Sequence, residues 1–312
     1  MKETGILPMS TASGVAGRMK RLAEQILIES GAERFARSRL RGDVLLLAYH
    51  NVLPEGESPS GDRSLHLNER DFAEQMDAVA ETHEVIPLSS ISDPPGARPR
   101  IVITFDDAYL GAITAGTRVL GSRNLPATIF VAPALLGAVT WWDLLADRET
   151  GEVPAERRHD ALEVRAGRRG AVLDRYTPHP GVRLENLPRI GTEEELAAVS
   201  NREGITFGSH SWSHPNLAVL AAPDVREELE RPLAWLRERF SCVVPWLSYP
   251  YGRFNSSVVD AARAAGYAGA FRIEGGRLDS QAMKRPFELA RLNVPAGVST
   301  EGFRLRVAGL LN

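Results

Sequence analysis

The feature that most constrains the fold is the segment RIVITFDD, residues 100–107, in which an unbroken apolar run ends in two adjacent carboxylates. A run rich in Val and Ile, without alternation, is typical of a strand buried on both faces, as in a parallel sheet. Asp106 and Asp107 follow each other at its end, where each negative charge raises the pKa of the other unless a positive group is close. The segment therefore predicts a parallel sheet with a positive partner at the end of this strand.

Other apolar runs repeat this arrangement along the chain, and helical patterns separate them. Strand-then-helix units with polar residues at the strand ends predict an α/β fold, either a parallel (β/α) barrel or a doubly wound sheet. The predicted strands are 43–50, 100–107, 127–133, 204–211, 246–252 and 268–273, with 287–295 completing the series. The predicted helices are 68–83 with Asn68 as N-cap, 110–122, 223–240 with a kink at Pro232, and 255–265.

Length and composition indicate how the chain is divided. With 312 residues, 43% hydrophobic and 25% charged, it fits one large α/β domain with an extension better than two equal halves. We predict a helical extension over 1–42 and a catalytic domain over 43–312. The stretch of about 143–200 is rich in Arg and Glu and reads as an insertion, a lid or partner surface. A net charge of -3 argues against binding nucleic acid.

The N-terminal sequence bears on the cellular location of the protein. They contain Lys and Arg but no uninterrupted apolar core before a cleavage site, and no run approaches the ~20 residues that span a bilayer. The single cysteine, Cys242, allows no intrachain disulfide. We therefore predict a cytoplasmic protein. Residues 17–42 form a basic amphipathic pattern, interpreted first as a helix packed on the domain and second as a peripheral anchor on an anionic membrane surface.

A metal ion is the positive partner that the sequence favours for the two aspartates. His210 and His214 are four residues apart just beyond the strand 204–211, and Pro215 places the pair in a loop or short turn. Two imidazoles and one carboxylate make a common three-ligand site for Zn²⁺ and similar ions. One aspartate would bind the metal while the other takes a proton from water. Either motif alone is weak, because an Asp pair often caps a turn and His-x-x-x-His occurs by chance.

Together these motifs resemble the polysaccharide deacetylases, carbohydrate esterase family 4, whose shared unit is the NodB homology domain. The family's Thr-Phe-Asp-Asp-Gly appears as TFDDAY, its His-Ser/Thr-x-x-x-His as HSWSH, and its proline-tyrosine segment as SYPYG, over roughly 43–300. The resemblance implies a distorted (β/α) barrel of the NodB type. It also implies metal-dependent removal of an acyl group, usually N-acetyl, from an amino sugar.

Carried over by motif, the resemblance implies a role for each matching residue. Asp106 is similar to the catalytic base, and Asp107, His210 and His214 to the ligands of a divalent metal, Zn²⁺ first with Co²⁺ or Ni²⁺ as alternatives. The backbone N–H of Tyr251 would stabilise the oxyanion. The implied partner is an acetylated amino sugar or oligosaccharide.

Three departures from the family pattern affect this assignment. Ala108 replaces the glycine after the aspartates, the arginine that often precedes the Pro-Tyr pair is missing, and no Leu-x-His supplies a C-terminal general acid. His50, at the end of the first strand, resembles the Tyr-His of the branch that deacetylates poly-N-acetylglucosamine, so it is either the acid or a hydrogen-bonded strand-end residue. Arg291 either orients Asp106 in place of the missing arginine or forms a structural salt bridge.

Residues near the predicted site are candidates for substrate binding. We assign this role to Pro250, Trp142 and Arg291; Trp141 and Trp142 offer a stacking platform for a sugar, although one of the two is expected to be buried packing. The other histidines have no partner motif and are expected on the surface or in loops: His66, His83, His159 and His179.

Other readings of the same residues remain open. The leading one is a deacetylase in the cytoplasmic synthesis of an exopolysaccharide or a lipid-linked precursor. A second keeps the fold and makes the protein an O-deacetylase, a deformylase or an amidase. A third is a carbohydrate-binding relative without turnover, supported by the missing histidine and arginine. The last is an iron oxygenase, which the order of the ligands and the alternation of strands with helices disfavour.

Overall fold

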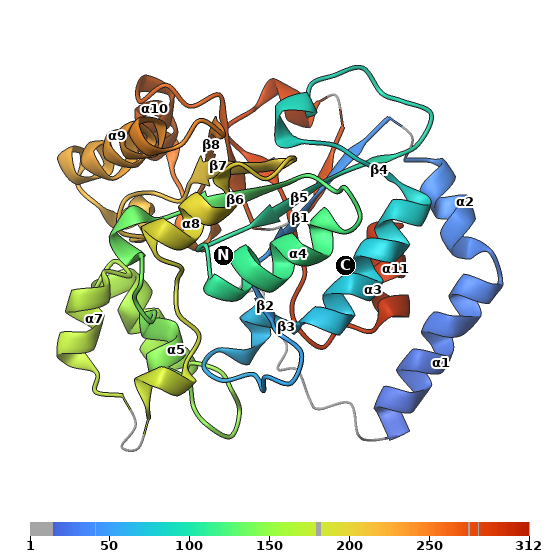
Figure 1. Ribbon diagram of the computed structural model, residues 1–312, viewed down its shortest axis with the longest axis horizontal. Coiled ribbons are helices and arrows are strands. Elements are labelled where there is room, and N and C mark those ends of the chain that lie inside the picture. The colour runs from blue at the N-terminus through green and yellow to red at the C-terminus, as the bar shows by residue number, and fades with distance from the viewer. Residues whose placement is uncertain (1–14, 41, 179–181, 274, 280, 312) are drawn as a thin grey trace.

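The apolar runs of the sequence form the wall of a parallel barrel in the computed structural model of the protein (Figure 1). The structure describes residues 15–40, 42–178, 182–273, 275–279 and 281–311. Strands β1 and β5 are buried at every position, which explains their unbroken apolar sequences. Six strands pair in parallel in this order: β1 (Val44–Tyr49), β5 (Arg100–Phe105), β6 (Ala127–Val131), β7 (Ile205–Ser209), β8 (Val243–Ser248) and β9 (Gly269–Arg272).

One short segment closes the barrel. Strand β11 (Leu289–Ala290) pairs in parallel with β9, and β12 (Leu292–Asn293) pairs in parallel with β1. Only Arg291 separates these two strands, so the segment joins the last strand of the series to the first. The prediction of a distorted barrel is confirmed, and the doubly wound sheet is wrong because that sheet would leave β1 and β9 unconnected.

Smaller strands extend this arrangement. Strand β10 (Arg277–Leu278) runs antiparallel to β1, and β4 (Glu84–Val85) pairs with β5. A separate parallel pair, β2 (Asn51–Leu53) and β3 (His66–Asn68), follows β1 directly. Residues just beyond the C-terminal end of β1 are thereby fixed by backbone pairing.

The predicted helices, together with α8 and α11, which were not predicted, cover the outside of the barrel. The aromatic rings of Tyr49, Phe72 and Phe105 lie 5.1 to 5.8 Å apart between centroids and join α3 to β1 and β5. Helix α9 continues through Pro232, and the helix predicted at 110–122 contains a π-helical turn, Ala112–Gly116. The covering helices are α3 (Glu69–Thr82), α4 (Thr117–Gly121), α8 (Glu193–Ser200), α9 (Ala222–Arg239), α10 (Ser256–Ala264) and α11 (Thr300–Val307).

The N-terminal segment forms two helices where the sequence predicted one. Helix α1 (Val15–Glu29) and α2 (Ala32–Ser38) are separated at Gly31, whose φ of 78° is a left-handed conformation that glycine adopts without strain. Helix α1 packs beside α11 at the edge of the molecule (Figure 1). Residues 1–14, part of the N-terminal stretch on which the cytoplasmic location was predicted, lie outside the described residues. Among the residues that are described, no helix is long and apolar enough to cross a membrane.

The segment 143–200, predicted to be an insertion, lies between β6 and β7. It contains most of α5 (Trp141–Leu145), and then α6 (Ala155–His159), α7 (Arg169–Arg175) and α8. Helices α5 and α7 lie side by side at one end of the barrel (Figure 1). Backbone bonds tie the segment to the loop after β5, since Gly191 N–H donates to Ala108 O at 2.9 Å. The domain boundaries stay a prediction, but α8 packs on β7 and so belongs to the barrel.

Candidate active site

A strained turn after β5 separates the two aspartates. Asp106 N–H donates to Tyr49 O at 2.9 Å, which continues the strand pairing, whereas Asp107 and Ala108 have φ of 67° and 58°. The left-handed region costs a residue with a Cβ about 1–2 kcal/mol, which gives a physical reason for the family's glycine at the position of Ala108. The turn gives the neighbouring carboxylates different partners.

Asp107 lies with the two predicted histidines beyond the end of β7. Its Oδ1 is 3.5 Å from His210 Nε2 and 3.2 Å from His214 Nε2, and the two Nε2 atoms are 3.1 Å apart. All three side chains are nearly fully buried. His214 is placed by a left-handed backbone with φ of 61° and by its N–H, which donates to Ser211 Oγ. The residues predicted as metal ligands therefore converge from two separate loops.

The three side chains fit a divalent metal ion. A tetrahedral Zn²⁺ with bonds of ~2.1 Å holds its ligand atoms about 3.4 Å apart, close to the distances between these donors. Asp107 Oδ1 is buried without a hydrogen-bond partner, which is costly unless a cation contacts it. His210 Nδ1 lies 2.7 Å from Ser248 O, so that a proton on Nδ1 leaves Nε2 free to bind metal.

The electrostatics of these three residues also suit a bound cation. Burial, together with Asp106 and Asp143, raises the pKa of Asp107 well above its ordinary value. Burial lowers the pKa of His210, and burial together with His210 lowers the pKa of His214 well below its ordinary value. Neutral imidazoles are the form that binds metal, and a bound cation would favour the ionised Asp107 that burial opposes.

Asp106 forms a two-pronged ion pair with Arg291. The guanidinium donates from Nη1 to Asp106 Oδ1 at 2.8 Å and from Nη2 to Oδ2 at 2.6 Å, and further to Thr104 and Ser248. Burial alone would raise the pKa of Asp106, but the charge and hydrogen bonds of Arg291 outweigh it and hold that pKa below its ordinary value. Arg291 is fully buried, so it contacts Asp106 rather than a bound sugar, and its assignment to substrate binding does not fit the structure.

His50 follows β1 on the same side of the barrel as the two aspartates. Burial is the main cause that lowers its pKa to about 4, and the charge of Asp106 acts in the opposite direction. The ring is therefore neutral at pH 7. Its role as a general acid stays a prediction.

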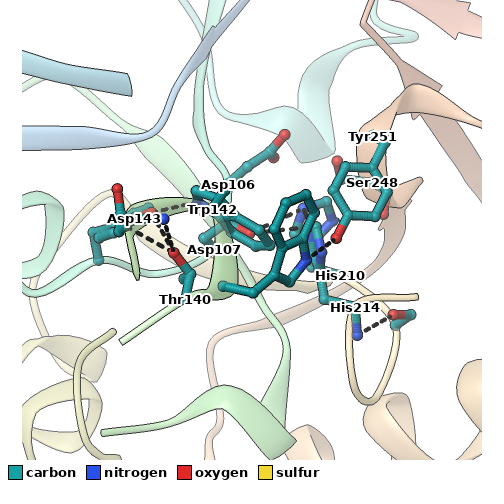
Figure 2. A network of polar contacts seen from close by, with 12 residues as sticks. Asp106, Asp107, Thr140, Trp142, Asp143, His210, His214, Ser248 and Tyr251 are labelled. Atoms are coloured by element: carbon teal, nitrogen blue, oxygen red, sulfur yellow. Dashed lines mark hydrogen bonds and ion pairs between the residues drawn. The ribbon is translucent and has the colours of Figure 1, made fainter. Parts of the chain in front are cut away.

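Trp142 and Tyr251 pack against His214, and Trp141 packs against both of them. Trp142 is 5% exposed, and its ring centroid lies 4.9 Å from that of His214. Figure 2 labels both side chains. Trp141 donates from Nε1 to Tyr251 Oη at 3.0 Å. Both indoles are thus buried, whereas only one was expected to be, and the packing does not favour an open stacking platform. Pro250 is buried at the start of the turn that gives Tyr251 a φ of 58°.

A buried polar network that the sequence did not predict supports this packing. Asp143 Oδ1 lies 3.0 Å from His66 Nε2, and its Oδ2 accepts hydrogen bonds from Tyr109 Oη at 2.6 Å and Thr140 Oγ1 at 2.8 Å. Figure 2 shows Asp143 beside Thr140. Trp142 Nε1 donates to the same Tyr109 oxygen at 2.8 Å. The network therefore connects Asp143, through Tyr109 and Trp142, to the ring of His214.

Two of the remaining histidines differ from expectation. His66 and His83 were expected on the surface or in loops, but they are 2% and 4% exposed. A hydrogen-bonded partner accounts for each, Asp143 for His66 and Thr82 for His83. His159 is exposed as predicted, and His179 lies outside the described residues.

Strained backbone gathers at the candidate site. Among the described residues, seven other than glycine have positive φ, and five of these belong to the loops just described. Such conformations persist where the surrounding structure enforces them, and they cluster at functional sites. The five residues are Asp107, Ala108, Ser211, His214 and Tyr251.

Comparison with known proteins identifies the family. The model of the polysaccharide deacetylase family matches residues 93–270, more than half of the chain. The chain belongs to the polysaccharide deacetylase family. The match contains both aspartates, both histidines and Tyr251, whereas His50 and Arg291 lie outside it.

Solved structures share the fold of this polysaccharide deacetylase domain. IcaB from Ammonifex degensii has a TM-score of 0.60 at 17% identity, covering 86% of this chain and 97% of that one. The Streptococcus pyogenes deacetylase PplD in complex with acetate has a TM-score of 0.58 at 14% identity, covering 83% and 96%. The BpsB deacetylase domain from Bordetella bronchiseptica has a TM-score of 0.56 at 16% identity, covering 82% and 97%.

Among curated proteins, the chain is similar to the uncharacterised protein YlxY of Bacillus subtilis (strain 168). The two are 26% identical over 68 residues, 22% of this chain. The similarity spans only 21% of the length of that relative.

Proposed function

We propose that the protein removes an acetyl group from an N-acetylated amino sugar, in a glycan or a glycan precursor, by metal-dependent hydrolysis. The observation that carries the proposal is the convergence of Asp107, His210 and His214 beside Asp106, a carboxylate that Arg291 holds ionised and in a fixed orientation. Membership of the polysaccharide deacetylase family supports the same reaction class.

Asp107, His210 and His214 would hold the ion, Zn²⁺ first, with Co²⁺ or Ni²⁺ as alternatives. When bound, such an ion supplies a Lewis acid and makes water easier to deprotonate. These three side chains would leave part of the ion open to water and substrate. The His210–Ser248 contact orients one ligand.

Asp106 is the proposed general base. Its carboxylate takes a proton from the attacking water, and Arg291 restricts it to one orientation through two hydrogen bonds. The Tyr251 amide, which follows a proline and sits in a left-handed turn, is the proposed donor to the oxyanion that develops on the acetamide oxygen.

His50 is the proposed general acid for the leaving amine. Because its pKa is lowered to about 4, the resting ring carries no proton to spare at pH 7. It acts as an acid only after receiving a proton during the reaction, and Asp106, whose charge raises the pKa of His50, is the proposed source. Acetate and a free amino sugar result.

Metal content tests the proposed site without any guess about the substrate. Elemental analysis of the protein purified without added metal is expected to find about one Zn²⁺, Co²⁺ or Ni²⁺ per chain. His210→Ala should lose it, whereas His159→Ala, which removes an exposed histidine, should keep it. A wild-type protein that is metal-free and does not bind added Zn²⁺ would contradict the proposal.

Product analysis then tests the bond that is cleaved. With oligomers of N-acetylglucosamine, we expect acetate and free amine in equal amounts, and Asp106→Asn should abolish both while retaining the metal. Acetate from an O-acetylated sugar, without new amine, would establish the O-deacetylase instead. Binding of the oligomer with no release by the metal-loaded protein would establish a carbohydrate-binding relative.

A further inference from the structure

Helix α1 has its apolar side turned away from the protein. Met19, Leu22 and Ile26 follow each other at intervals of three and four residues, which places them along one side of a helix. Their exposed fractions are 66%, 59% and 55%. We call these three residues the N-terminal apolar stripe.

The opposite side of α1 faces the domain and carries a buried acid, Glu24, beside the half-buried Ile28. Glu24 lies about 200° around the helix from both Leu22 and Ile26, and it is 4% exposed. Its carboxylate accepts a hydrogen bond from Ser299 Oγ at 2.7 Å, at the start of α11. A helix stabilised only by packing on its own domain would bury Leu and Ile and expose Glu, so this orientation indicates a second surface.

The charges around the stripe are positive. Among the described residues of α1 and α2 and the residue that follows them, Glu29 is the one exposed acid, whereas Glu24 and Glu33 are buried. Glu33 is also paired, with Arg37 and Arg304. The exposed cations are Arg18, Lys20, Arg21, Arg34 and Arg39. This excess contrasts with the net charge of -3 of the whole chain.

We propose that α1 lies on an anionic lipid surface, with the N-terminal apolar stripe in the headgroup boundary and the adjacent cations on lipid phosphates. Arg18 and Lys20 flank Met19 along the chain, and Arg21 precedes Leu22, so each apolar side chain near the start of the helix has a basic neighbour. Such a combination of apolar and basic residues favours an anionic interface.

A second copy of the chain is the competing occupant of the stripe. A symmetric dimer would place the same basic flanks against each other, and this like-charge repulsion opposes association. Phe35 on α2 is also 63% exposed, with the Arg39 guanidinium 4.5 Å from its ring centroid, which adds a further basic and aromatic pair to the exposed surface. The charge therefore favours lipid over a second copy.

Vesicle flotation tests the proposal with the full chain. The protein should float with vesicles of phosphatidylcholine and phosphatidylglycerol, not with phosphatidylcholine alone, and binding should weaken as salt is raised. Leu22→Gln with Ile26→Gln, which keeps the charge, should weaken binding at least tenfold. Arg18→Gln with Arg21→Gln should weaken it and reduce its salt dependence.

Matched controls separate the stripe from exposed apolar residues in general. Val164→Gln and Leu184→Gln change side chains that are 70% and 59% exposed elsewhere, and they should leave vesicle binding unchanged. Either of two results would overturn the proposal. One is a wild-type protein that does not bind anionic vesicles, and the other is glutamine variants of the stripe that bind these vesicles as well as wild type does. A concentration-dependent dimer that Leu22→Gln with Ile26→Gln dissociates would also overturn it and assign the stripe to a second copy.

Discussion

The guanidinium of Arg291 donates two hydrogen bonds to the carboxylate of Asp106 inside the barrel, although the two residues are 185 positions apart in the chain. Arg291 lies between β11 and β12, in the segment that pairs with both β9 and β1. The residue that closes the barrel therefore also orients the proposed base. Closure of the fold and construction of the site depend on the same five-residue segment.

Removing one partner of this pair should destabilise the protein more than removing both. Arg291→Met leaves a buried carboxylate without its cation, and Asp106→Asn leaves a buried guanidinium without its anion. Each single change is expected to cost about 3–5 kcal/mol of unfolding free energy, and the double variant should recover part of that loss. Urea unfolding of the four proteins gives the coupling energy. Strictly additive losses would show that the two side chains do not interact.

The variant His50→Ala tests whether His50 acts as a general acid or has only a structural role. If His50 protonates the leaving amine, its loss should lower kcat about 10²–10⁴-fold on an N-acetylated sugar. An activated aryl acetate has a leaving group that needs no proton, so the same variant should lose far less activity on that substrate. The loss of kcat on each of the two substrates, measured under the same conditions, distinguishes the two roles. An equal loss on both would assign His50 a supporting role.

The strands could be predicted because each is a local property of the sequence. Val44–Tyr49 and Arg100–Phe105 are continuous apolar runs, and such runs pair in parallel only when helices cover them. The aspartates and histidines were found because they follow those runs at the strand ends, where α/β folds place their sites. Local pattern thus predicted the parallel α/β strands and the residues at their C-terminal ends, while the choice of a barrel over a doubly wound sheet came from the family resemblance.

Long-range contacts account for what the sequence did not predict. The partner of His66 is Asp143, 77 residues away, and neither residue lies in a recognisable motif. The sequence could not decide between an orienting and a structural role for Arg291, because its contact with Asp106 joins residues far apart in the chain. In contrast, the break at Gly31 had a local signal, because glycine favours the left-handed conformation that ends helices.

Asp143→Asn should weaken metal binding although Asp143 is not a proposed ligand. The amide is isosteric, but it weakens the hydrogen bonds from Tyr109 and His66 that place Trp142 against His214. Supporting residues of this kind typically change metal affinity 10–100-fold. Competition with a chromophoric chelator measures the affinity for Zn²⁺ in the absence of substrate. Asp174→Asn, at an exposed position, is the control, and equal affinities for both variants would contradict the prediction.

Stability in mild acid should depend on His83, which is buried and makes no contact with the candidate site among those described. Burial, and then the charges of Arg37, Arg98 and Arg277, lower its pKa to about 3. Well above pH 6.5 the ring is neutral in both the folded and the unfolded chain, and it contributes no pH dependence. As the pH falls from 6.5 toward 3, the unfolded chain takes up a proton that the folded protein excludes, so the unfolding free energy decreases.

The contribution of His83 is at most about 1.4 kcal/mol per pH unit. His83→Gln, which cannot titrate, should therefore lose less stability than wild type between pH 7 and pH 5, whatever its stability at pH 7. Urea unfolding at several pH values gives the two slopes, and every other titrating group cancels in their difference. Identical slopes would mean that His83 is protonated without penalty in the folded protein, which its burial and its three arginine neighbours argue against.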